Sequence, residues 1–196
     1  MAQTTKLEAV NTMLSAIGEA PVTALNLGLV EADIAETILQ SVSKEVQSQG
    51  YSFNRQLSVA YNPDTNNNIV LPADILRADS TQKTGNLDLV QRGLRMFDRV
   101  NNTYTITSTV FLDTVTELDF LDLPEVVKRY ITIRAGRIFL DRVVGSATLH
   151  GFSEKDEARA LSEIRDMEGE GQDFNVFNNF DTYQIINRVA GKRVTT

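Results

Sequence analysis

Hydrophobic residues change their spacing twice along this 196-residue chain, and this pattern constrains the fold more than any other feature. From about Lys6 to Gly18 and from about Glu31 to Gln49 they recur every three or four residues, as on one face of a helix. Between residues 51 and 122 they form short runs typical of strands. Helical spacing returns from Pro124 to about Val144 and from about Ser153 to Glu168. The pattern predicts an α+β protein, mainly a helical bundle with an inserted antiparallel β-rich subdomain.

Local signals mark the ends of these helices. Thr5 and Glu8 have the spacing of a capping box, in which each side chain bonds a free backbone N–H at the helix start. Gly18 and Gly50 suit the left-handed conformation that ends many helices. We expect residues 169–171 to end the last helix and His150 to lie in the loop before it.

Within the β-rich segment, the clearest predicted strand runs from Thr109 to Phe120, where apolar or β-branched residues alternate with acidic ones. Residues 57–61 and 69–72 are further strand-like runs on either side of an Asn-rich loop. Residues 84–86 and 101–102 have turn composition. We therefore divide the chain into a helical bundle (1–50 and 123–171), a β-rich subdomain (51–122) and an extended C-terminal arm (172–196).

The composition leaves little for catalysis. The chain has no cysteine and one histidine, which excludes thiolate chemistry and multi-histidine metal sites. No Gly-rich phosphate loop is present, and the loop of residues 62–68 resembles a turn more than a calcium loop. We expect no enzyme activity, no cofactor and no metal. The alternative is a carbohydrate or peptidoglycan hydrolase that uses carboxylates such as Glu117 or Glu154.

The balance of charge also narrows the possible partners. A net charge of −7 argues against broad nucleic-acid binding, which needs clustered Lys and Arg. The sequence contains no run of about 18 apolar residues, the length that would predict a membrane span. A structural assembly protein or a generic helical binding module fits these features better than an enzyme does.

The two C-terminal predicted helices carry opposite charge, basic in residues 124–145 and acidic in residues 153–173. Either the two faces pair within one chain, or the basic face of one subunit meets the acidic face of the next, where complementarity sets register and partner choice. The residues that we expect at such an interface are Lys128, Arg129, Arg134, Arg137, Glu154, Asp156, Glu157 and Glu163.

The last 25 residues combine aromatic rings with a basic end and lack a helical period. The rings either pack on the chain's own core or form a docking arm, since aromatic residues are common interface anchors. The residues predicted to dock are Phe174, Phe177, Phe180, Tyr183, Arg188, Lys192 and Arg193.

Several segments resemble one protein family in the same order along nearly the whole chain. The opening run from Ala9 to Val22 (AVNTMLSAIGEAPV), with its Ile-Gly-Glu-x-Pro-Val element, is the most specific. Residues 47–54 (QSQGYSFN), residues 123–137 around Leu-Pro-Glu, Tyr-Ile and Arg137, and residues 154–167 (EKDEARALSEIRDM) follow. Together they resemble the tail tubular protein A family, the head-to-tail adaptors of short-tailed bacteriophages.

The resemblance implies a structural virion protein at the head–tail junction, assembled in the host cytoplasm. Similar proteins form a dodecameric ring that joins the portal protein to the nozzle protein, tail tubular protein B. Tail fibres commonly attach nearby, and DNA leaves through the lumen without specific binding. The family fold is a helical bundle with an inserted β-rich domain. An acidic subunit suits a channel wall that must not hold phosphate tightly.

Overall fold

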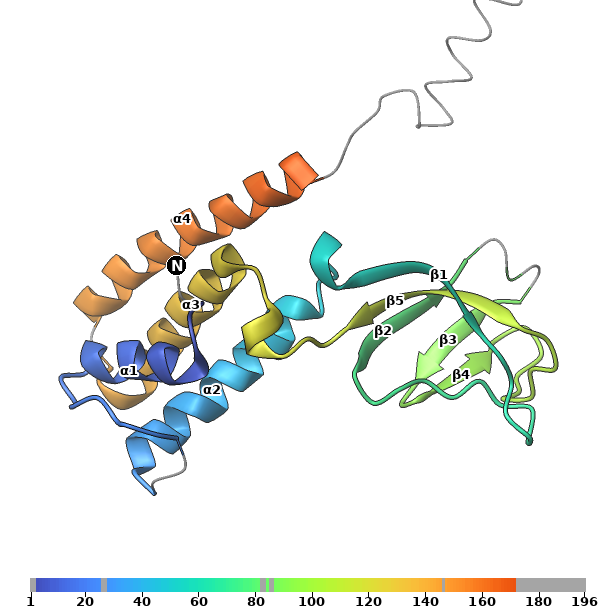
Figure 1. The fold of residues 1–196 in the computed structure, drawn as a ribbon, viewed down its shortest axis with the longest axis horizontal. Coiled ribbons are helices and arrows are strands. Elements are labelled where there is room, and N and C mark those ends of the chain that lie inside the picture. Colours follow the sequence, from blue (N-terminus) through green and yellow to red (C-terminus); the bar gives the residue numbers. More distant parts are fainter. Residues whose placement is uncertain (1–2, 26–27, 82–83, 85–86, 146, 172–196) are drawn as a thin grey trace, which may run out of the picture.

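In a computed structural model, helices gather on one side of the molecule and an antiparallel sheet lies on the other (Figure 1). The structure describes residues 3–25, 28–81, 84, 87–145 and 147–171. Two helices precede the sheet in sequence and two follow it, so the strands are inserted between helical segments. The mixed α+β class predicted from hydrophobic spacing is confirmed.

The first two helices form where the spacing predicts them. Helix α1 (Lys6–Ala16) begins at the predicted capping box: Glu8 N donates to Thr5 Oγ1 at 3.2 Å, and Thr5 N donates to Glu8 Oε2 at 2.8 Å. Helix α2 (Val30–Gln47) buries one apolar face and leaves its polar side chains largely outside. Both helices therefore need a partner to cover their apolar faces.

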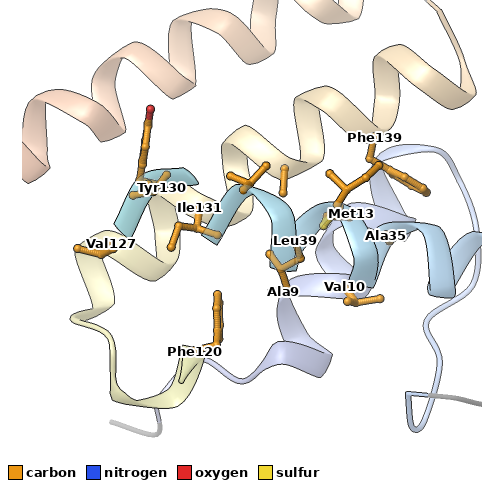
Figure 2. Close-up of a cluster of buried hydrophobic side chains, with 14 of the residues drawn as sticks. Ala9, Val10, Met13, Ala35, Leu39, Phe120, Val127, Tyr130, Ile131 and Phe139 are labelled. Atoms are coloured by element: carbon orange, nitrogen blue, oxygen red, sulfur yellow. The ribbon is translucent and has the colours of Figure 1, made fainter. Parts of the chain in front are cut away.

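That partner is helix α3 (Glu125–Val143), which contacts α1, α2 and α4. Figure 2 shows side chains from α1, α2 and α3 meeting in one hydrophobic cluster. Val10, Leu39 and Phe139 are at most 1% exposed. Burying a side chain of this size contributes about 1.5–3 kcal/mol, so this cluster holds the helices together.

Helix α4 (Ala147–Gly171) is longer than predicted at both ends. The predicted start at Ser153 is wrong by six residues, and His150 lies within the helix instead of in a loop. The glycines that we expected to end it, at 169 and 171, are both part of the helix, as is Gly151. A glycine in a helix costs only about 1 kcal/mol relative to alanine, which packing against α3 can offset.

The sheet has the order β1-β5-β2-β3-β4 with every neighbouring pair antiparallel. Its strands are β1 (Arg55–Tyr61), β2 (Ile75–Ser80), β3 (Leu89–Arg92), β4 (Arg95–Asp98) and β5 (Val110–Thr116). A second hydrophobic cluster, which includes Leu71, Met96 and Leu112, packs on this sheet. The described residues therefore form two clusters of buried side chains, one among the helices and one at the sheet.

Several strand predictions need correction. The predicted strand from Thr109 to Phe120 ends at Thr116, and Phe120–Asp122 forms the short 3-10 helix η3. Residues 69–72 form no full strand, and only Val70 makes a bridge, to Arg95. The turn at residues 101–102 is confirmed, with Asn102 at φ +52°. The predicted turn at residues 84–86 lies partly outside the described residues.

The junction between helices and sheet is built from buried polar side chains. Gln47, fully buried at the end of α2, donates from Nε2 to Leu118 O at 3.1 Å and accepts from Leu118 N at 2.8 Å. Asn54, in the 3-10 helix η1 (Ser52–Asn54), donates to Gln47 O and to Thr116 O. These bonds satisfy backbone groups at the end of α2 and at the end of β5, so the two elements are fixed to each other.

Candidate functional site

Helix α3 presents apolar residues to α1 and α2 and basic residues to α4. Val127, Ile131 and Phe139 are fully buried in the helical core. Arg129, Arg134 and Arg137 lie on other faces of the helix, where a helical period of 3.6 residues places them near α4.

Three helices meet in one network of charged side chains. Arg134 donates from Nη1 to Glu157 Oε1 at 2.6 Å and from Nη2 to Glu45 Oε1 at 2.7 Å. Arg137 donates from Nε to the other oxygen of Glu157, and its Nη1 lies 3.6 Å from Asp141 Oδ2. Because Glu45 is in α2 and Glu157 is in α4, the two arginines of α3 tie all three helices together.

The network keeps its members charged. Burial alone would raise the pKa of Glu157, but hydrogen bonds from Arg137 and Arg134 outweigh it and hold the pKa below its ordinary value. The hydrogen bond to Glu157 likewise raises the pKa of Arg137. Burial acts to lower the pKa of Arg134, yet bonds to Glu157 and Glu45 leave it raised. These charged, mutually bonded groups act as a structural clamp.

The remaining predicted basic residues of α3 also find partners within the chain. Arg129 donates to both carboxylate oxygens of Glu163 in α4, at 3.0 and 2.8 Å. Lys128, predicted as an interface residue, is fully buried, and its Nζ donates to Glu125 Oε1 at 3.0 Å. This bond lowers the pKa of Glu125, so the buried ammonium group faces a charged carboxylate.

The eight predicted interface residues therefore separate into two sets. Six of them form ion pairs within one chain. Five of these residues pair α3 with α4, as in the first of the two readings of the charge pattern, whereas Lys128 pairs with Glu125 in α3 itself. Glu154 and Asp156 are exposed and have no salt bridge among the described residues. A role for the eight residues between subunits stays a prediction. The six paired residues are Lys128, Arg129, Arg134, Arg137, Glu157 and Glu163.

The C-terminal residues predicted to dock lie outside the described residues. They are Phe174, Phe177, Phe180, Tyr183, Arg188, Lys192 and Arg193.

Sequence reasoning missed three contributors. Glu45 completes the arginine network from α2, and Glu168 of α4 accepts from both the backbone N and Oγ of Ser52. Gln47 belongs to a segment that resembles the family, and that resemblance gives it no physical role. Its spacing from Asn54, with a helix-ending Gly50 between them, was the available signal for the junction.

Glycine at position 50 is required by the junction. Its φ is +80°, and a Cβ there would lie 2.7 Å from Val115 Cγ2 and 2.8 Å from Arg77 Nη2. Next to it, the rings of Tyr51 and Phe53 stack with centroids 5.6 Å apart. The run from Gln47 to Asn54 is thus explained by hydrogen bonds, a left-handed turn and ring packing.

Comparisons with known proteins identify the chain at the level of a family. None of the described helices is long and apolar enough to cross a bilayer, and the described residues contain no cluster of three or more potential metal ligands. A search of curated proteins found no match. Residues 7–174 match the family described as "Tube: Tail tubular protein", which covers the helices, the sheet and the junction between them. The chain therefore belongs to the tail tubular protein family and is a structural protein of a bacteriophage tail.

Proposed function

We propose that this protein is a ring-forming head-to-tail adaptor that joins the portal to the tail nozzle and forms part of the DNA ejection channel. The family match over residues 7–174 is the observation that carries the proposal. The opening run from Ala9 to Val22 supports the adaptor type within that family, because it resembles the adaptors of short-tailed phages.

The clamped helices suit this role. An adaptor must transmit force between the capsid and the tail without unfolding, and ion pairs that join three helices stiffen the bundle. The junction at Gln47 and Asn54 likewise fixes the sheet to the helices. A net charge of −7 suits a wall past which DNA slides, since phosphates gain little from an acidic surface.

We further propose that the protein is not an enzyme. A glycoside hydrolase needs a carboxylic acid whose pKa is raised so that it can protonate the leaving group. Where a shift is resolved among the described carboxyl groups, at Asp98, Glu125 and Glu157, hydrogen bonds lower the pKa instead. Glu117, a candidate for the hydrolase reading, pairs with Lys44 at 3.2 Å.

Electron microscopy of the purified protein, alone and mixed with portal protein, tests the adaptor role. We expect closed rings that dock coaxially on the portal, with twelve copies as the family resemblance implies. A protein that stays monomeric with portal present would contradict the proposal. In parallel, cell-wall and oligosaccharide assays should give no turnover; activity that Glu117→Gln or Glu154→Gln abolishes would make the protein an enzyme.

We also propose that residues 172–196 dock on a neighbouring subunit or partner. Truncation after Gly171, where α4 ends, should leave a folded protein with the helical circular-dichroism signal of the full chain. Its association with portal or with other copies should weaken, because four rings and three basic residues are lost. If the truncated protein is unfolded instead, the aromatic residues belong to its own core.

A further inference from the structure

Two surface patches combine exposed apolar side chains with charges of opposite sign that form no salt bridge among the described residues. The hairpin patch lies where β3 turns into β4 and where residues 69–71 run beside β4. The helix-start patch lies at the beginning of α2. The hairpin patch comprises Val70, Arg92, Leu94 and Arg95. The helix-start patch comprises Leu29, Val30, Glu31, Asp33 and Ile34.

The arginines of the hairpin patch are held in place by aromatic rings. Arg92 and Arg95 face each other across the hairpin. The guanidinium carbon of Arg92 lies 3.5 Å from the centroid of the Phe97 ring, and that of Arg95 lies 4.5 Å from the centroid of Tyr104. The two rings pack edge to face, 4.9 Å apart.

This stacking orders both guanidinium groups, and neither arginine has a salt bridge within the described part of the chain. Ordered arginines lose less entropy when they bind a carboxylate, so the patch is prepared for an anionic partner.

Apolar side chains border these arginines. Val70 pairs directly with Arg95 across the bridge and is 50% exposed, and Leu94, in the turn, is 46% exposed. A phosphate backbone offers nothing for such side chains to bury against, and the acidic chain as a whole repels nucleic acid. The mixture of apolar and basic groups therefore favours a protein surface over DNA as the partner.

The helix-start patch has the complementary character. Val30 and Ile34 are 64% and 39% exposed, and with Asp33, Ile38 and Arg142 they line a shallow depression between α2 and the end of α3. Glu31 and Asp33 form no salt bridge with any described residue. The positive end of the α2 dipole stabilises these carboxylates, and Arg142 also lines the depression.

The two patches cannot meet within one chain. The start of α2 lies at the end of the helical part away from the sheet, and the junction at Gln47 fixes the sheet to the opposite end of α2 (Figure 1). We propose that the hairpin patch of one copy docks on the helix-start patch of a second copy, with Leu94 against Val30 and Ile34 and with Arg92 and Arg95 facing Glu31 and Asp33. This interface rests on the proposed ring-forming function and gives it a specific contact.

Such a contact is heterologous, because each copy contributes a different surface. An open assembly of subunits is then left with a free hairpin patch at one end and a free helix-start patch at the other, so that the association repeats until the rotation closes a ring. Burial of apolar side chains supplies affinity, and the charge pairs set the register.

Charge swaps test the contact in the full-length protein by light scattering and sedimentation. One variant carries Arg92→Glu and Arg95→Glu, and another carries Glu31→Lys and Asp33→Lys. Each alone should associate at least about tenfold more weakly than the wild type, because like charges then face each other. A mixture of the two variants, and a protein with all four changes, should regain assembly. The control, Lys155→Glu with Arg159→Glu on the exposed face of α4, reverses the same number of charges and should assemble normally.

The outcomes separate this inference from the adaptor role. If the wild type forms rings and the single-patch variants do too, or if the control fails as they do, the inference is overturned while the ring stands. If the mixture and the fourfold variant fail to regain assembly, the inference is likewise overturned. The hairpin patch would instead be a phosphate site if two results came together: the fourfold variant fails to assemble, and Arg92→Glu with Arg95→Glu abolishes DNA binding. A wild type that is monomeric even with portal overturns both proposals.

Discussion

At the scale of single residues, Glu157 shows what a sequence pattern leaves open. Its position in an acidic run predicts an exposed helix face, yet its side chain is only 11% exposed and accepts from two arginines. The pattern predicted the opposite charges of the two helices but not the partners. Which arginine meets which carboxylate depends on the angle at which α3 and α4 cross. Glu45, the other partner of Arg134, lies in α2, 89 residues before Arg134 in the chain.

Glu157→Gln tests how much this carboxylate stabilises the fold. The change keeps the shape of the side chain but leaves Arg134 and Arg137 without their shared anion in a partly buried place. We expect the free energy of unfolding to fall by about 2–4 kcal/mol, as for breaking a buried ion pair from one side. Urea unfolding followed by circular dichroism measures it. Glu154→Gln, on the exposed face of the same helix, should change the value by less than about 0.5 kcal/mol.

The wild type and Glu157→Gln should also differ in how their stability depends on pH. The pKa of Glu157 is lowered below its ordinary value of 4.5 in the folded protein, so its contribution to stability is fully present above that value. The contribution is lost as the pH falls through the lowered, folded-state pKa. The stability difference between wild type and Glu157→Gln should therefore be constant near neutral pH and shrink below pH 4.5. A difference that grows in acid would contradict this assignment.

At the scale of elements, helices were easier to predict than their connections. The capping box at Thr5 and the apolar face of α2 are local signals, and both helices lie within two residues of their predicted bounds. The extra turns of α4 were missed because glycine is a weak helix former, and tertiary packing overrode that preference. The strand order β1-β5-β2-β3-β4 had no local signal, because pairing partners far apart in sequence leave no mark on hydrophobic spacing.

Gly50 offers a test of the junction with a matched control in the same chain. Gly50→Ala adds a Cβ against Val115 and Arg77 at a positive φ, whereas Gly18 has a similar φ of +83° and open space around it. Gly18→Ala should cost only the backbone preference, about 1 kcal/mol. Gly50→Ala should cost more, about 2–4 kcal/mol, because Val115 must also move. Equal losses in thermal or urea unfolding would show that the junction relaxes without resistance.

At the scale of the whole molecule, the part of the chain that the structure describes has two hydrophobic clusters joined by a polar junction. Leu14 belongs to the helical cluster and Leu112 to the sheet cluster, and both are fully buried. Separate clusters favour separate unfolding, while the bonds of Gln47 and Asn54 couple the two parts. Dividing the chain into a helical bundle and a β-rich subdomain amounts to proposing that the separate packing of the two clusters outweighs their coupling through Gln47 and Asn54.

We propose that the two clusters unfold separately, and paired cavity variants test it. Leu112→Ala and Leu14→Ala should each lower local stability by about 2–5 kcal/mol. Hydrogen exchange followed by mass spectrometry should then show Leu112→Ala accelerating exchange in β1, β2 and β5 but not in α3. Leu14→Ala should do the reverse, since the lost packing lies among the helices. If either variant accelerates exchange equally in both parts, the junction couples them into one cooperative unit. The protein would then unfold as one unit, and replacing Gln47 and Asn54 should uncouple the unfolding of the helices from that of the sheet.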